Sequence, residues 1–334
     1  MIRVALLSRW HVHADDYARE AIAHPDLQVE MVWDEDPDRG RRWANELDVA
    51  FEADIDQVCS SPDIDAVIIT TPTDQHKKVM LKACQYQKHI FSEKVLAFTI
   101  EDCQEIIKQA EDAGIKLMLS LPRLTEKEFL QADHALNEGW LGDLSMIRCR
   151  LAHNGAVAPA GKEAGWLPKR FFNKAQTGGG ALIDLGAHPI YLTNRLAKDP
   201  KAVYARMQPQ VSKDVDDAAV VTIEYASGAL GVVETGFLSY SSPFQLELYG
   251  TEGVLLAEEG RIRLKSIHYG DNQWIEIDEQ LPVVATPMEQ WVNAIQTDEP
   301  TFITAQDMMQ LTMINQAARH SHQEGKRIEV SDIK

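Results

Sequence analysis

The sequence predicts an α/β protein in which a parallel sheet is followed by a second, mostly antiparallel sheet. Up to about residue 120, short β-branched runs alternate with stretches of helical spacing, which is typical of a doubly wound parallel sheet. Beyond Pro122 the runs follow one another with little helix between them, which indicates antiparallel pairing. A chain of 334 residues also exceeds the usual size of a single core, so we expect two domains, residues 1–122 and 123–334.

The expected strands of the first domain are runs that are mostly apolar on both faces, as buried parallel strands are. They cover residues 2–8, 27–34, 64–71, 89–92 and 115–119. Helical spacing covers residues 16–23, 37–47, 74–86 and 100–113. Ligands of such a sheet bind beyond the carboxyl ends of its strands, so a site is expected in the loops that follow them.

The second domain is expected to begin with a helix at residues 126–138 and a strand at 144–152. Further strands are expected at residues 201–210, 218–225, 229–237, 244–249, 261–267 and 274–277, several of them separated by turn signals. A last helix is expected over residues 305–323, with Gly325 as its stop signal. Helices can cover only one face of this sheet, so we expect the other face to pair with a second copy in a homodimer or homotetramer.

Charge and composition restrict the possible partners. Acidic residues outnumber basic ones by 51 to 33, and the formal charge of −18 opposes contact with nucleic acids and anionic membranes. No apolar run approaches the ~20 residues that span a bilayer, and the apolar start is too short for a signal peptide. The four cysteines are widely spaced, which is typical of neither a zinc site nor a disulfide framework. We therefore expect a cytoplasmic protein with a small-molecule ligand.

The loop from Ser8 to Ala14 lies where a dinucleotide site would have its glycines, but it contains none. An acidic residue is present at the end of the second strand, where Asp34 would accept a hydrogen bond from a ribose 2′-hydroxyl, although an Asp there is also a common turn residue. His11 and His13, with Asp15, match the spacing of a metal pair. A metal-dependent hydrolase would need a (β/α)₈ barrel, which the antiparallel second half argues against, so we expect no metal.

Two polar segments follow strands and are expected at the ligand-facing edge of the first sheet. Thr70 to His76 follows the strand at residues 64–71, and Phe91 to Lys94 follows the strand at residues 89–92. Taken singly, each segment has a structural explanation, such as a solvated lysine at position 94.

A glycine-rich segment from Thr177 to His188 is expected to open a helix in the second domain. Asp184 and His188 would then share one helical face, because they are four residues apart. Pro189 disfavours regular helix at His188, so a kink there would spoil or sharpen that alignment. The alternatives are a hinge formed by the glycines and a buried, hydrogen-bonded His188.

Taken in order, these segments resemble the Gfo/Idh/MocA family of oxidoreductases, whose members pair an N-terminal Rossmann domain with a C-terminal α/β domain built on a large, mostly antiparallel sheet. The family motifs T-P-x-x-x-H, E-K-P and G-G-G-x-x-x-D-x-G-x-H match, in this order, Thr71, Pro72 and His76, then Glu93 and Lys94, then Gly178 to Gly180, Asp184, Gly186 and His188. This chain departs from the family in its glycine-free loop, in Val95 where the family has proline, and in Tyr191 where many members have a second Asp.

The resemblance implies a dehydrogenase that transfers a hydride between NAD, or NADP, and a secondary alcohol of a sugar, inositol or related polyol. His188 would be the general base, oriented by Asp184, and Lys94 would stabilise charge on the substrate oxygen. The acidic run that begins at Asp34 favours NAD over NADP. Because the loop lacks glycines, a non-catalytic, nicotinamide-responsive regulatory protein of the same fold is the alternative.

The resemblance and the positions of the segments together give two sets of expected contacts. Cofactor contacts are expected from Ser8, Trp10, His11, His13, Asp34, Thr71, Pro72, His76 and Glu93, the last on the nicotinamide ribose. Substrate contacts are expected from Lys94, Arg123, His153, Trp166, Arg170, Asp184 and His188.

Overall fold

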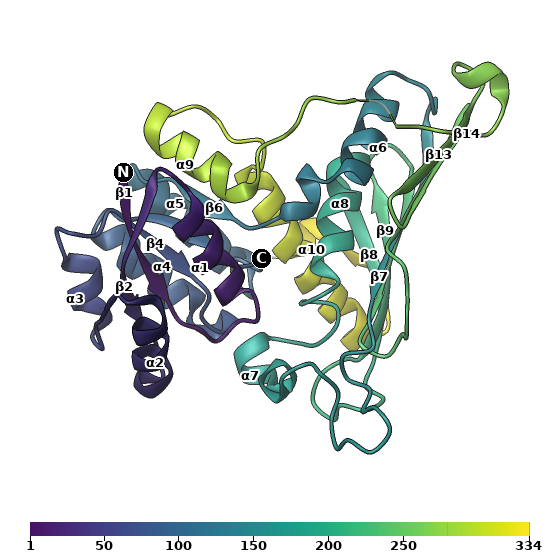
Figure 1. Ribbon diagram of the computed structural model, residues 1–334. Helices are drawn as coiled ribbons and strands as arrows, with labels where there is room; N and C mark the ends of the chain where they lie inside the picture. Colours follow the sequence, from purple (N-terminus) through teal and green to yellow (C-terminus); the bar gives the residue numbers. More distant parts are fainter. Residues whose placement is uncertain (279, 334) are drawn as a thin grey trace. The chain divides into compact units, whose positions relative to one another are not determined.

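The computed structural model describes residues 1–278 and 280–333, and the chain forms two compact units. The first unit joins residues 1–120 to residues 285–309, and the second joins residues 121–284 to residues 310–334. Each unit therefore combines segments that lie far apart in the sequence, as the colours of Figure 1 show. Among the described residues, none of the helices is both long and apolar enough to cross a membrane.

The first unit contains the expected parallel sheet, with strand order β3-β2-β1-β4-β5-β6. Its strands are β1 (Ile2–Leu7), β2 (Leu27–Trp33), β3 (Ala50–Phe51), β4 (Ala66–Ile69), β5 (His89–Ser92) and β6 (Leu117–Leu119). Its helices are α1 (Ala14–Ala23), α2 (Pro37–Leu47), α3 (Ile55–Ser60), α4 (Thr73–Gln85), α5 (Ile100–Asp112) and α9 (Pro287–Thr297). The strand order reverses between β1 and β4, and such a switch point is where open α/β sheets bind their ligands.

Local sequence explains why α2 begins where it does. The side chain of Asp36 caps the helix by accepting hydrogen bonds from the N–H groups of Asp38 and Arg39, and Pro37 occupies the first helical position. This cap fixes Arg39 in the first turn, directly after the end of β2.

The second unit contains the expected, mostly antiparallel sheet, with strand order β14-β13-β12-β11-β7-β10-β9-β8-β15. Its strands are β7 (Leu144–Ala152), β8 (Pro200–Gln208), β9 (Ala218–Tyr225), β10 (Leu230–Gly236), β11 (Gln245–Gly250), β12 (Gly253–Glu258), β13 (Arg261–Ser266), β14 (Ile275–Glu276) and β15 (Ile328–Glu329). Among the described strands of this second sheet, only β7 and β10 pair parallel.

The helical elements of the second unit include α6 (Lys127–Asn137), α7 (Lys174–Thr177), α8 (Ala187–Ala197) and most of α10 (Ala305–Glu324), with short 3₁₀ turns η1 (Pro122–Thr125), η2 (Lys169–Phe172), η3 (Gly270–Asn272) and η4 (Val330–Asp332). Helix α8 packs against β7 and β10. Alternate strand residues such as Ile147 and Val233 are fully buried. The intervening residues carry the charged group of Arg148 with Glu234 and Glu247, so the opposite face of the sheet is mixed rather than purely apolar.

The glycine-rich segment does not open the helix where the sequence predicts it. Residues 181–186 form turns, and α8 begins only at Ala187, so Asp184 lies outside the helix. The prediction that Asp184 shares a helical face with His188 is therefore wrong, and the question of a kink between them does not arise. Pro189 falls in the first turn of α8, where its missing N–H needs no helical partner.

Candidate functional site

The loop after β1 keeps a glycine-like backbone without glycine. Ser8 adopts a φ of 80°, in the left-handed region that glycine usually supplies. Its hydroxyl accepts a hydrogen bond from the N–H of Trp10 at 3.0 Å, and its carbonyl accepts one from the hydroxyl of Thr70 at 2.5 Å. The loop is thereby tied to the end of β4, next to the switch point of the sheet.

Most main-chain N–H groups of this loop are used within the protein. The N–H of Arg9 donates to Asp34, that of His11 to the carbonyl of Thr70, and that of His13 to the ring of His11. Helix α1 also carries acidic residues in its first turn. A pyrophosphate therefore meets fewer N–H donors and more negative charge here than at a glycine loop that leads into a helix.

Asp34, at the end of β2, is buried and forms an ion pair with Arg39. The Nε and terminal N–H groups of Arg39 donate to both carboxylate oxygens of Asp34, at 2.9 and 2.6 Å, and Arg39 also binds Glu35 at 2.6 Å. The carboxylate predicted for the ribose hydroxyl is present, and its partner was not predicted. The only signal in the sequence is the spacing of Asp34 and Arg39 across the capped start of α2.

Thr71 and His76, from the T-P-x-x-x-H segment, are both buried. The hydroxyl of Thr71 has no hydrogen-bond partner within the described part of the chain, whereas buried hydroxyls are ordinarily paired. The ring of His76 lies between the carbonyls of Val95 and Thr71, at 2.8 and 3.2 Å, and burial lowers its pKa despite both carbonyls. His76 therefore connects the two segments, while Thr71 offers a group that a ligand can satisfy. Pro72 is the N-cap residue of α4.

Glu93, after β5, is buried at a point where three other side chains meet. Its Oε2 lies 3.1 Å from Nδ1 of His13 and 3.7 Å from Nδ1 of His11, and it accepts a hydrogen bond of 2.5 Å from the hydroxyl of Tyr17. Burial by itself would raise the pKa of this carboxyl, but the two imidazoles and Lys94 hold it well below its usual value. Tyr17 was not expected here, and the one signal for it in the sequence is its position one helical turn after His13.

Lys94 follows directly and is 6% exposed. The peptide bond that joins it to Val95 is cis. Val95, which stands where the family's E-K-P motif has proline, is apolar and buried.

In the second unit, the ring of His188 is held by Tyr191. The phenol oxygen lies 2.8 Å from Nδ1 of His188 and accepts a hydrogen bond of 3.2 Å from the N–H of Arg123. Burial raises the pKa of Tyr191 well above its usual value, so the phenol keeps its hydrogen. That hydrogen is paired when the phenol donates to Nδ1, which leaves the ring hydrogen of a neutral His188 on Nε2.

The glycines before Asp184 pack against the backbone of Asp216. A Cβ on Gly180 would lie 2.0 Å from the carbonyl oxygen of Asp216, so only glycine fits there. The carboxylate of Asp216 accepts hydrogen bonds from the N–H groups of Gly180 and Leu182, and burial raises its pKa. The close approach that the glycines permit is thus between two parts of the chain, and it fixes the turn that carries Asp184.

Of the expected substrate residues, the structure brings His153 and Trp166 together. The ring of His153 stacks on Phe237 with centroids 5.1 Å apart, and Trp166 lies 4.7 Å from the same imidazole. Trp166 is 59% exposed.

The two expected arginines lie in separate 3₁₀ turns. The guanidinium of Arg123 lies 4.6 Å from the ring centre of Phe244 and pairs with Glu126. The guanidinium of Arg170, in η2, lies 6.0 Å from the ring centre of Phe171. The main chain of Arg123 joins the His188 group, whereas Arg170 belongs to a different local cluster.

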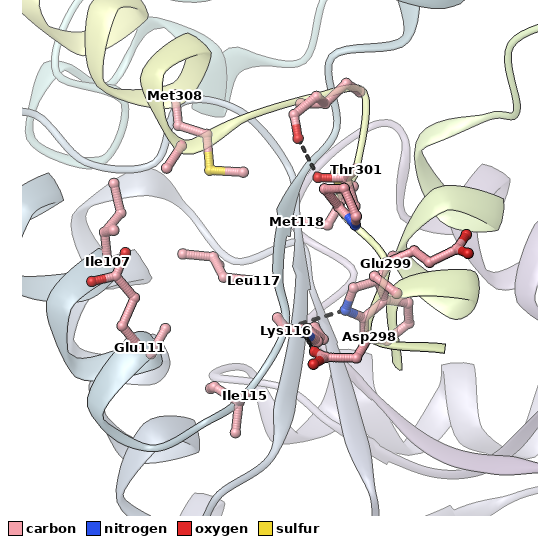
Figure 2. A pocket seen from close by; sticks show the side chains of 16 residues that line it. Ile107, Glu111, Ile115, Lys116, Leu117, Met118, Asp298, Glu299, Thr301 and Met308 are labelled. Atoms are coloured by element: carbon pink, nitrogen blue, oxygen red, sulfur yellow. Dashed lines mark hydrogen bonds and ion pairs between the residues drawn. The ribbon is translucent and has the colours of Figure 1, made fainter. Parts of the chain in front are cut away.

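A pocket of about 310 Å³ in the first unit lies beside β6 and contains none of the predicted site residues. Its lining is largely apolar, with Ile107, Leu117 and Met308 among the side chains that Figure 2 shows. Lys116 and Asp298 form an ion pair at its rim. It offers no convergent catalytic groups, so the candidate site remains at the carboxyl ends of the strands.

Comparison with protein families matches both parts of the chain. Residues 11–121 match the oxidoreductase family with the NAD-binding Rossmann fold, and residues 129–256 match the GFO/IDH/MocA C-terminal domain. The chain belongs to the Gfo/Idh/MocA family. The family predicted from the three motifs is therefore confirmed.

Several relatives of this Gfo/Idh/MocA protein match over most of its length. The uncharacterized oxidoreductase YrbE of Bacillus subtilis is 22% identical, over 89% of this chain and 87% of the relative. Myo-inositol 2-dehydrogenase of Thermotoga maritima is 20% identical, over 83% of each chain. The 1,5-anhydro-D-fructose reductase of Ensifer adhaerens is 27% identical, over 75% of each chain.

Solved structures share the fold at low identity. GenD2 from gentamicin A biosynthesis, in complex with NAD, aligns with a TM-score of 0.83 at 22% identity, over 98% of this chain and 96% of its own. Levoglucosan dehydrogenase in complex with NADH and levoglucosan aligns with a TM-score of 0.83 at 20% identity, over 98% of this chain and 99% of its own. Both establish that the two-domain fold of this Gfo/Idh/MocA protein extends over nearly the whole chain.

Proposed function

We propose that this protein is an NAD-dependent dehydrogenase that acts on a secondary alcohol of a sugar, inositol or related polyol. The observation that carries the proposal is His188, which occupies the family's motif position in the first turn of α8. The similarity to inositol and anhydrosugar enzymes supports the substrate class. The four cysteines are free and buried, which fits the cytoplasmic location that we propose.

The first unit would bind the dinucleotide and the second would hold the substrate. Asp34 and the unpaired hydroxyl of Thr71 suit the hydroxyl and phosphate groups of a dinucleotide. When bound, NAD supplies the hydride acceptor. Arg39 is already engaged with Asp34 and Glu35, so it has little charge to offer to the 2′-phosphate of NADP.

Removing a hydride from an alcohol carbon requires the hydroxyl proton to leave as well. His188 would exchange that proton through Nε2, and Lys94 would stabilise negative charge on the same oxygen. To accept a proton at Nε2, a neutral ring must carry its hydrogen on Nδ1, which leaves the hydrogen of Tyr191 unpaired. An unpaired buried donor costs about 1–3 kcal/mol, so Tyr191 disfavours the base form of His188 by that order.

Two variants and a substrate screen test this proposal. NAD reduction is measured over a panel of inositols, aldoses and sugar acids, and then His188→Ala and Lys94→Met are compared with the unmodified protein on the substrate found. Each variant should lose roughly 10²- to 10⁴-fold in turnover. Affinity for NAD should change far less, because Asp34 and the loop after β1 would hold the other half of the cofactor. Turnover within a fewfold of the unmodified protein in both variants would refute the site.

A regulatory protein that binds nicotinamide nucleotides without turnover is the second candidate. The glycine-free loop, whose N–H groups between Arg9 and His13 are paired within the protein, departs from the family's glycine-rich loop and favours this candidate. Tight NAD binding by calorimetry with no reduction over the whole panel would favour this function over the dehydrogenase.

A further inference from the structure

Two histidines of the loop after β1 and the carboxylate after β5 meet in the first unit. His11, His13 and Glu93 each offer a ligand atom, and these atoms lie within 4.8 Å of one another. His11 and Glu93 are buried, and the side chain of His13 is 42% exposed. The rings of His11 and His13 are tilted by 60° to each other, with centroids 4.8 Å apart, so the two imidazoles are not stacked.

The separations suit a small divalent ion. Zinc binds His nitrogen and carboxylate oxygen at about 2.0–2.2 Å in tetrahedral geometry, which places neighbouring ligand atoms roughly 3.3–3.6 Å apart. Oε2 of Glu93 lies 3.1 Å from Nδ1 of His13 and 3.7 Å from Nδ1 of His11, on either side of that range. Nδ1 of His11 accepts a hydrogen bond of 3.2 Å from the N–H of His13, so a metal ion would either replace that hydrogen bond or bind His11 through Nε2. All three ligand atoms lie within 4.8 Å of one another, so the two imidazoles would have to approach each other by up to about 1.5 Å to reach coordination distance.

The main chain fixes all three residues. The N–H of His11 donates to the carbonyl of Thr70, His13 is the N-cap residue of α1, and the N–H of Glu93 donates to the carbonyl of Ile69. The hydroxyl of Tyr17 also holds the Oε2 oxygen of Glu93, and such an outer hydrogen bond orients a ligating carboxylate. The cluster is therefore arranged by the ends of three neighbouring strands rather than by a mobile surface.

The structure also decides which acidic residue can accompany the two histidines. Asp15, which the sequence places beside them, pairs with Arg9 at 2.8 Å. Glu93, 80 residues from His13 in the sequence, takes its place. A pair of imidazoles with one carboxylate is a common donor set for divalent transition metals, and it leaves further coordination positions open.

We propose that His11, His13 and Glu93 bind a divalent transition-metal ion of the Zn²⁺ type, with the remaining positions taken by water or by an oxygen of a bound ligand. This proposal replaces the sequence-based expectation of no metal. It depends on the first unit alone. Because His11, His13 and Glu93 are also expected cofactor contacts, a bound ion would share these side chains with the dinucleotide, and the test is therefore made without NAD.

Calorimetric titration of the EDTA-treated full chain with ZnCl₂ tests the proposal. A large excess of Mg²⁺ is kept present, because a chain of net charge −18 also attracts cations to its surface carboxylates. The unmodified protein should bind one equivalent of Zn²⁺ under these conditions. His11→Gln, His13→Gln and Glu93→Gln should each weaken binding by about 10-fold or more, since even outer-shell changes cost about 10- to 100-fold.

Two matched variants serve as controls. Asp15→Asn removes the acidic residue that the sequence alone would choose, and His24→Gln removes an imidazole at the other end of α1. Both should bind Zn²⁺ as the unmodified protein does. Co²⁺ added to the unmodified protein should give visible d–d absorption that excess Zn²⁺ abolishes, and this readout does not depend on any variant folding.

Loss of all Zn²⁺ binding in excess Mg²⁺, or equal binding by the three ligand variants and the unmodified protein, would overturn the site. Neither NAD nor a substrate is needed for the titration. Failure of the metal site is therefore distinguishable from failure of the proposed dehydrogenase.

Discussion

At the end of β2, the ion pair between Asp34 and Arg39 should determine which nicotinamide cofactor is bound. Among the ion pairs of the described residues, replacing Asp34 with Ala would leave Arg39 with Glu35, and a guanidinium is well suited to a phosphate. We expect Asp34→Ala to weaken NAD binding and to reduce or reverse the preference for NAD over NADP, as measured by calorimetric titration with both nucleotides. The control is Asp38→Ala, at an exposed position of α2 next to Arg39, and this variant should keep the preference for NAD. An unchanged preference in Asp34→Ala would show that another group reads the ribose.

Tyr191 should determine which nitrogen of neutral His188 carries the hydrogen. With Phe at position 191 the donor to Nδ1 is lost, so the Nδ1–H form should increase. Two-bond ¹⁵N–¹H correlation spectra report the tautomer directly, and the His188→Gln spectrum identifies the signal. Tyr204→Phe, at an exposed position of β8, is the control. If the His188 signal of Tyr191→Phe matches that of the unmodified protein, Tyr191 does not set the tautomer.

Single residues could be predicted from the sequence where a motif or strand end marked them, as for Asp34 and His188. Their partners could not. Tyr17 and Glu93 are 76 residues apart and Arg123 and Tyr191 are 68 apart, so these contacts exist only in the folded chain. A pattern of residue types along the chain does not specify such long-range pairs.

The elements β7 and β9 have the bounds that their alternating or β-branched pattern predicts. Elements β3, α3 and β15 are too short to show a periodicity, and β12 was hidden behind the turn signal at its start. Helix α9 was missed although Thr286 and Glu289 form a capping box at its start, a signal that was present in the sequence.

The glycine segment before α8 should tolerate substitution unequally. A Cβ at Gly180 would meet the carbonyl oxygen of Asp216 at 2.0 Å, whereas the nearest atom at Gly179 is a side-chain carbon of Ile183 at 3.2 Å. We expect Gly180→Ala to lower the free energy of unfolding by about 1–3 kcal/mol, as overpacking does, and Gly179→Ala to lower it less. Urea unfolding measures both, and equal effects would mean that the segment moves freely away from Asp216.

For the molecule as a whole, His76 should make stability depend on pH. Its pKa in the folded chain lies below the ordinary value of 6.5, because burial disfavours the charged ring. Below pH 6.5 the unfolded chain therefore binds a proton that the folded chain does not. As the pH is lowered, the free energy of unfolding decreases until the folded pKa is reached. His76→Gln should show a shallower fall than the unmodified protein in urea unfolding from pH 7 to 5, and His24→Gln should not. Equal slopes in all three would remove His76 as the cause.

Assembly into a dimer or tetramer remains a prediction. The sheet face opposite the helices, through which it would form, is mixed rather than apolar as the sequence suggests. The exposed apolar residues Met146, Val220 and Leu230 share the sheet with the charged group around Arg148. A dimer or tetramer through this mixed face should weaken when Val220 is replaced by Glu, because a buried, unpaired carboxylate is costly. Light scattering at micromolar concentration measures the mass, and a monomer before any substitution would contradict the prediction.

The return of the chain to the first unit has a consequence for anyone who wishes to isolate the nucleotide-binding half. Trp291 is fully buried there, lies 5.7 Å from the ring of Phe91 and donates a hydrogen bond to the carbonyl of Lys116. A fragment cut after residue 120 would lack α9 and would expose the apolar surface that Trp291 covers. Such a truncated fragment should aggregate through this exposed apolar surface. A fragment in which residues 285–309 are joined back through a short linker should bury the surface again and stay in solution.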